Sequence, residues 1–293
     1  MMHTIARSRS RDGSGISVAD RVPPVSSPRA AAPRRSWGRR DVLLWQGLTA
    51  VLLIGAWALG WAGEVLPRAL LPAPWEVLVA GAGLITTAPF WAALGSTLLA
   101  AVMGLLISVA IGVPLGLIMG LAPAAYRSSL LIIDVGRSFP SIALLPVLIL
   151  VIGTTVEMKV FVIVSGIVWP ILLQTYYGAR RVDPVVNDTV RSYRIPPLLH
   201  FAKVLLPNAA PFAVTGIRIA ASAAILIALG VEVLTLNPGM GGNLARAQTD
   251  GAPALALAYL VYAGLLGWIL YRALTFVEDR LLVWNRRGKG GAR

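Results

Sequence analysis

Six long and mostly apolar stretches run through this chain of 293 residues. A helix of about 20 apolar residues crosses the roughly 30 Å of hydrocarbon in a bilayer, so each stretch is long enough to be a transmembrane helix. The predicted spans are residues 42–62, 91–120, 128–152, 158–178, 208–231 and 253–276. The pattern therefore predicts an all-α membrane protein with six transmembrane helices.

The composition agrees with residence in a membrane. Hydrophobic residues make up 57% of the chain and charged residues 13%, about half the charged share of a soluble domain. The net charge of +13 lies in the ends and loops rather than on one basic face, which argues against nucleic acid as a partner. Cysteine is absent and only two histidines occur, so disulfides and thiolate metal sites are excluded and no metal site is predicted.

The chain divides into a long apolar region between two basic ends. Residues 1–41 are rich in Arg, Ser, Pro and Ala, a composition that cannot bury enough apolar surface to fold, and we expect a disordered basic cytoplasmic tail. Residues 42–276 form the predicted transmembrane domain, which contains a polar loop at 179–207. Residues 277–293 form a second basic cytoplasmic tail.

Lysine and arginine are distributed unevenly between the two sides of the membrane. If both termini face the cytoplasm, twenty-one of these residues lie in cytoplasmic segments, and only Arg68, Lys159 and Arg246 lie in external ones. Cytoplasmic loops carry the excess of Lys and Arg in membrane proteins. The sequence therefore predicts a multi-pass protein with both termini in the cytoplasm, whose tail arginines also contact anionic lipid.

The 179–207 loop is too polar to enter the membrane and too long to be a simple turn. Asp183 can cap a helix that Pro184 opens and that runs to about Tyr193. Pro196 and Pro197 end that helix and open a second one, which Pro207 is expected to close. Two short helices at an angle would then stand on the cytoplasmic face.

The same loop resembles the signature loop of the permease subunits of ABC importers. That signature reads E-A-A, three residues, G, nine residues, then I-x-L-P, and its spacing is intact here. The matching positions are Asp188, Thr189, Val190, Arg194, Val204, Leu206 and Pro207. Arg194 stands where the family has glycine, which leaves the geometry of this turn open, because arginine disfavours the left-handed backbone that glycine allows.

The likeness extends over nearly everything after residue 41. Residues 71–74 look like the family's external L-P-S-P, and residues 137–146 look like its R-x-x-P-x-x-A-x-x-P third helix. Residues 215–220 resemble the start of its fifth span, and Glu232 with residues 239–241 resembles the external loop that follows. This combination is similar to the branch that imports nitrate, sulfonates, taurine and thiamine precursors.

The resemblance implies the type I importer permease (MetI-like) fold in the cell inner membrane. It implies three kinds of partner: cytoplasmic ATPase subunits, which carry the ATP and Mg that this chain lacks, an extracytoplasmic substrate-binding protein, and a second copy of the permease. The cargo would be a small solute such as nitrate, a sulfonate or taurine. In the loop, we expect Val190, Leu198 and Phe201 to fill a groove of the ATPase. Asp188, Arg191 and Arg194 would fix the register.

Four charged residues near span ends have two interpretations each. Asp134 and Arg137 share a helical face and are either pathway residues or a local ion pair. Arg218 is either a functional charge in a span or a contact of the 179–207 loop. Glu232 either touches the binding protein or a gate, or lies at a solvated helix end.

Two other classes of protein compete with an importer permease. An ion-coupled secondary transporter would place carboxylates or interrupted helices at the bilayer midplane, and the spans offer no central acid except, at most, Asp134. An intramembrane enzyme would need convergent His, Asp or Glu groups, which the spans lack. We therefore expect a permease that is not itself an enzyme, with an ion-coupled secondary transporter as the alternative.

Overall fold

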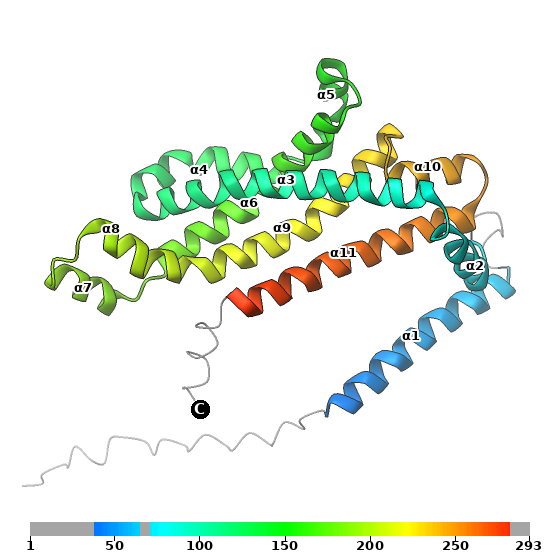
Figure 1. Cartoon of the computed structure of the whole chain (residues 1–293), viewed down its shortest axis with the longest axis horizontal. Coiled ribbons are helices and arrows are strands. Elements are labelled where there is room, and N and C mark those ends of the chain that lie inside the picture. Colours follow the sequence, from blue (N-terminus) through cyan, green and yellow to red (C-terminus); the bar gives the residue numbers. More distant parts are fainter. Residues whose placement is uncertain (1–37, 65–70, 282–293) are drawn as a thin grey trace, which may run out of the picture. The chain divides into compact units, whose positions relative to one another are not determined.

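The computed structural model describes residues 38–64 and 71–281 (Figure 1). These residues fold almost entirely into helices, and no strand occurs among them. They divide into a first unit that ends at Leu53 and a second unit that begins at Ile54. Most of the two predicted tails lies outside the described residues.

Five helices are long and apolar enough to span a membrane, and each coincides with one predicted window. They extend a few residues beyond the windows, and the last one runs into the segment predicted as the C-terminal tail. They are α1 (Arg39–Ala62), α3 (Ala88–Leu121), α6 (Val156–Arg180), α9 (Leu206–Thr235) and α11 (Pro253–Leu281).

The window at 128–152 is a bent pair of helices rather than one straight span. Here α4 (Pro123–Ser138) is followed by the 3-10 turn η2 (Ser141–Leu144) and by α5 (Leu145–Ile152), and the two parts meet at 85°. The bend lies at Phe139 and Pro140, which are both extended, because a proline disfavours helical geometry in the residue before it. Counted as one span, the pair brings the total among the described residues to six.

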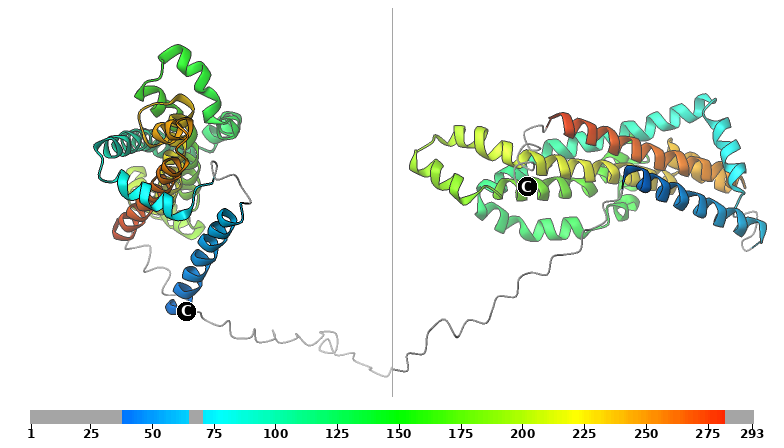
Figure 2. Two further views of the ribbon diagram at one scale, coloured as in Figure 1. Left: turned by 90° about the vertical axis from the view of Figure 1, so that its right-hand side faces the viewer. Right: turned by 90° about the horizontal axis from the view of Figure 1, so that it is seen from below.

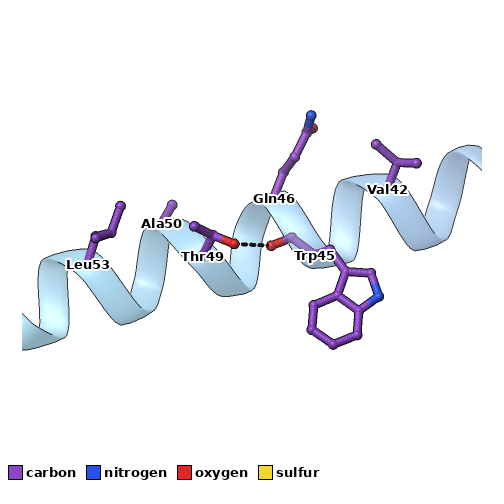
Figure 3. Close-up of a pocket in the computed structure, with 6 residues that line it drawn as sticks. All are labelled: Val42, Trp45, Gln46, Thr49, Ala50 and Leu53. Atoms are coloured by element: carbon purple, nitrogen blue, oxygen red, sulfur yellow. Dashed lines mark hydrogen bonds between the residues drawn. The ribbon is translucent and has the colours of Figure 1, made fainter.

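The described part of the first unit is the beginning of α1. Its side chains are mostly apolar and exposed on all sides, which is typical of a helix surrounded by lipid. Figure 3 shows one face of this segment, where the hydroxyl of Thr49 donates a hydrogen bond to the carbonyl of Trp45 (2.8 Å). The polar hydroxyl thus has its hydrogen-bond partner within the helix. The side chains along this face are Val42, Trp45, Gln46, Thr49, Ala50 and Leu53.

The core of the second unit lies between α3, α6 and α9, which run side by side (Figure 2). Small side chains dominate the contacts, and in α9 Ala220, Ala221, Ala224 and Ala228 have no exposed surface. Small residues let helix backbones approach closely, which is how helices associate in a bilayer. Helix α11 packs on α9 and on the short helix α2 (Pro74–Leu84) at the margin of this core.

A row of glycines on α3 faces α6. An added Cβ at Gly104 would touch Ile163, and one at Gly116 would lie 2.6 Å from the carbonyl oxygen of Leu172. Gly112 and Gly120 meet the same helix. The four- and eight-residue spacing of these glycines thus reflects close packing of α3 on α6.

We expect Gly116→Val to destabilise the α3–α6 contact by about 1–3 kcal/mol, because the new side chain would overlap the α6 backbone. Gly95→Val is the matched control, since nothing lies within 4 Å of a Cβ at that position of the same helix. Thermal unfolding of the two purified variants in detergent measures the difference. Equal melting temperatures would show that α3 and α6 do not pack this closely.

Short helices stand at both ends of the second unit (Figure 1). At one end lie α2 and α10 (Met240–Thr249), and at the other end lie α7 (Pro184–Ser192) and α8 (Pro197–His200). The helices of the 179–207 loop were predicted from the sequence, but α10 was not. Its first residues are glycine-rich and read as a turn.

Candidate functional site

The 179–207 loop begins with the predicted helix α7. Asp183 is its N-cap and accepts a hydrogen bond from the backbone N–H of Val185 (2.8 Å). Pro184 occupies the first turn, where its missing N–H has no cost. The Asp-Pro pair therefore starts the helix, as the sequence analysis predicts.

The turn after α7 has the left-handed conformation that the signature glycine would favour. Arg194 has φ of 50°. The N–H of Ile195 donates to the carbonyl of Val190 (3.0 Å), and the N–H of Arg194 donates to that of Arg191 (3.1 Å). These two bonds form a Schellman motif. The turn geometry is therefore present although arginine replaces glycine.

We expect Arg194→Gly to stabilise this turn by about 1 kcal/mol, because a left-handed residue with a Cβ is strained by roughly that amount. Hydrogen exchange of peptides that cover residues 189–195 should slow by about fivefold. Arg191→Gly is the control, since the same change inside α7 should cost about 1 kcal/mol and speed exchange. Faster exchange in Arg194→Gly would contradict the interpretation of the turn.

The second half of the loop does not end at Pro207, so that prediction is wrong. Helix α8 continues through a π-helical segment, η3 (Phe201–Leu205), directly into α9. Pro207 lies in the first turn of α9. In the wider π turn, the N–H of Leu206 donates to the carbonyl of Phe201. The chain therefore enters α9 although Pro207 has no N–H to donate.

The predicted docking residues differ in exposure. Leu198 is 80% exposed, and the neighbouring Tyr193 is 79% exposed. Phe201 is half-buried and packs against a buried cluster of its own chain, formed by Leu117, Ala179, Leu205 and Ala209. Phe201 therefore contributes to internal packing, while Tyr193 and Leu198 are the most exposed of the large apolar side chains in the loop.

The residues predicted to fix the register of docking lie partly around a cavity. This cavity, of about 620 Å³, separates the loop from the ends of α3 and α6, and Asp188, Val190, Arg191 and His200 are among its lining residues. Arg194 lies on the exposed turn instead. Val204 is half-buried, and Leu206 is 42% exposed.

Three of the four charged positions, Asp134, Arg137 and Arg218, form ion pairs at the surface or between helices of their own chain. Arg137 Nε lies 3.0 Å from Asp134 Oδ1, and both side chains are about half exposed, which matches a local ion pair on α4. Arg218 Nη1 lies 3.0 Å from Glu278 Oε2 on α11. Arg218 is therefore paired between two helices of the bundle.

Glu232, near the end of α9, is fully buried, so the interpretation as a solvated helix end is wrong. The chain leaves α9 through Leu236, which has a left-handed backbone with φ of 54°. This turn brings the first residues of α10 against the Glu232 side chain. The carboxylate is thereby enclosed by its own chain.

The Glu232 carboxylate has one charged partner and two neutral donors. Lys159 Nζ, in the first turn of α6, lies 2.7 Å from Oε1, and it also donates to the carbonyl of Pro238 (3.0 Å). The hydroxyl of Thr97 on α3 lies 2.9 Å from Oε2, and the N–H of Gly241 on α10 donates to the same oxygen (3.0 Å). One carboxylate therefore connects α3, α6, α9 and α10.

The backbone at the start of α10 is shaped for this approach. The N–H of Met240 donates to the Thr97 hydroxyl (2.9 Å). Gly239 has φ of 153°, and a Cβ there would overlap the Glu232 carboxylate. Only glycine fits such a close approach of backbone to a charged group.

From the sequence, Lys159 was expected only as an external charge, and its pairing with Glu232, 73 positions away, was not predicted. The available signal was a lone lysine at the beginning of one apolar span and a lone glutamate at the end of another, followed by closely spaced glycines. Within residues 38–64 and 71–281, no group of three His, Asp or Glu side chains could hold a metal ion.

Residues 112–283 match the family described as the inner membrane component of binding-protein-dependent transport systems. The chain belongs to this family. Membership confirms the resemblance seen in the 179–207 loop, and it makes the protein a non-enzymatic membrane permease of an ABC importer. Such a permease works with an ATPase and a substrate-binding protein.

Curated relatives align over most of this permease. The putative aliphatic sulfonates transport permease of Escherichia coli is 30% identical over 87% of this chain and 96% of its own length. The taurine transport system permease of the same organism is 27% identical over 84% and 91%, respectively. The nitrate import permease of Leptolyngbya laminosa is 26% identical over 79% and 85%.

Proposed function

We propose that this permease forms the pathway for a small anion, in the class of nitrate, taurine and aliphatic sulfonates, and that ATP hydrolysis on a partner drives it. The observation that carries the proposal is the 179–207 loop, which presents Tyr193 and Leu198 to a partner at the end of the bundle opposite α10. The names of three relatives support the cargo class.

A second copy of the permease completes the pathway. Helix α5 projects from the bundle of α3, α6 and α9 (Figure 1). Large apolar residues of α5 are exposed. Val147 is 61% exposed, Leu150 is 87% exposed and Val151 is 73% exposed. We propose that α5 packs against the partner copy and that the remaining apolar surface contacts lipid.

Uptake by proteoliposomes tests this function against the alternative of an ion-coupled transporter. The complete assembly should accumulate labelled nitrate, taurine or an alkyl sulfonate only when ATP is supplied to the ATPase, and collapse of ion gradients by ionophores should not stop it. An ATPase that cannot hydrolyse ATP is the control. Uptake that needs an ion gradient and no ATPase would contradict the proposal.

The orientation is tested in the same cysteine-free chain. We expect an impermeant maleimide to label Gln248→Cys, exposed on α10, in intact cells. Thr189→Cys on α7 and Ser8→Cys in the N-terminal tail should react only after the membrane is opened. Labelling of Thr189→Cys in intact cells would reverse the predicted topology.

A further inference from the structure

The buried pair of Lys159 and Glu232 has no part in the ATPase-facing loop, since it lies at the opposite end of the bundle. We propose that this pair, together with Thr97, is a latch that positions α10 on the ends of α3, α6 and α9. This proposal rests on the proposed function. When the substrate-binding protein pushes on α10, the latch would make all three core helices move together.

The energetics of burial favour a positioning role over simple stabilisation. Lys159 and Glu232 are both almost fully buried. Removing two charges from water is costly, and an apolar pair of similar size is often as stable or more stable. An ion pair instead makes the arrangement specific, because its hydrogen bonds are satisfied in only one arrangement of the four helices.

The contacts of α10 are divided between the latch, helix α11 and the outside. Its first two residues, Met240 and Gly241, donate their N–H groups to Thr97 and Glu232. Its later residues Arg246, Gln248 and Thr249 are exposed. The beginning of the helix is thus fixed to the bundle, while its other face is available to a partner.

The latch connects three helices near the ends that lie beside α10. Lys159 is in the first turn of α6, Thr97 is one of the early residues of α3, and Glu232 is near the end of α9. Each of these helices continues through the core toward the end that carries α7 and α8 (Figure 1). A displacement of α10 therefore acts on the same three helices that lead to the ATPase-facing loop.

Cysteine labelling of the purified full-length chain tests the latch without any partner. Ala247 on α10 is 3% exposed, and the chain has no cysteine of its own. In a Thr97→Val background, which removes the hydroxyl and keeps the shape, we expect N-ethylmaleimide to modify Ala247→Cys at least tenfold faster. Thr97→Ser, which keeps the hydroxyl, should leave the rate unchanged.

Ala73→Cys is the control for general loosening, because Ala73, the N-cap of α2, is also buried and lies outside the latch. Its rate should not respond to Thr97→Val. An unchanged rate at Ala247→Cys, or an equal acceleration at both positions, would overturn the latch. If Thr97→Val cannot be purified, the conservative change of Glu232 to Gln in the same assay decides by the same two outcomes.

ATP hydrolysis by the reconstituted importer tests the transmission role. Thr97→Val should assemble and keep basal hydrolysis, while stimulation by the substrate-binding protein falls at least tenfold. Thr97→Ser should keep the stimulation of the wild type. Stimulation equal to wild type in Thr97→Val would overturn the role in transmission. If the wild-type assembly itself hydrolyses no ATP, the proposed function fails, whereas the labelling ratio still decides whether the latch exists.

Discussion

Lys159→Met should destabilise the folded chain by about 3–5 kcal/mol, because it leaves the Glu232 carboxylate buried without its cation. Thermal unfolding in detergent, followed by tryptophan fluorescence, should show a melting temperature that is lower by roughly 10 °C. The neutral double variant Lys159→Met, Glu232→Gln should recover at least half of this loss. Its amide can still accept from Thr97 and Gly241, and no unpaired charge remains.

The exposed pair on α4 provides the matched control for this prediction. Arg137→Met removes the cation of a pair of similar length, but the two side chains are about half exposed, at 55% and 48%. Exposed pairs contribute about 0–1 kcal/mol, so the melting temperature should change little. Equal shifts in Lys159→Met and Arg137→Met would show that burial does not set the strength of the Lys159–Glu232 pair.

The features that the sequence predicts best are those that depend on neighbouring residues. Apolar length located five helices and the bent pair, because crossing a bilayer is a constraint on consecutive residues. Asp183 and Pro184 located the start of α7, because an N-cap acts within its own first turn. The spacing of the glycines of α3 is visible in the sequence, but their partner, α6, is not.

The features that the sequence did not predict depend on contacts between distant segments. A charge near the end of a membrane helix is usually solvated, and only the fold places Lys159 beside Glu232. Pro207 reads as a helix breaker, yet the π turn before it carries the chain into α9. The sequence suggests that Phe201 is an exposed anchor, but Phe201 packs against a buried cluster that includes Leu117 of α3 and Ala179 of α6.

Leu198→Ala should weaken binding of the ATPase subunit by about thirtyfold, since truncation of a well-packed interface anchor costs about 2 kcal/mol or more. Leu198 is the most exposed leucine of the 179–207 loop and stands on α8, where a partner can enclose it. Tyr193, on the turn after α7, is exposed to a similar extent, at 79%. We expect Tyr193→Ala to act in the same direction and the double variant to release the ATPase during purification.

Phe201→Ala would give a less specific result, because Phe201 supports the internal packing of the loop and its loss would also lower stability. Leu131→Ala is the better control, since Leu131 on α4 is 75% exposed and the substitution is the same. The measurement is the affinity of each purified variant for the isolated ATPase subunit, with its melting temperature. An affinity of Leu198→Ala and Tyr193→Ala equal to that of Leu131→Ala, at unchanged melting temperature, would place ATPase docking elsewhere on the cytoplasmic face.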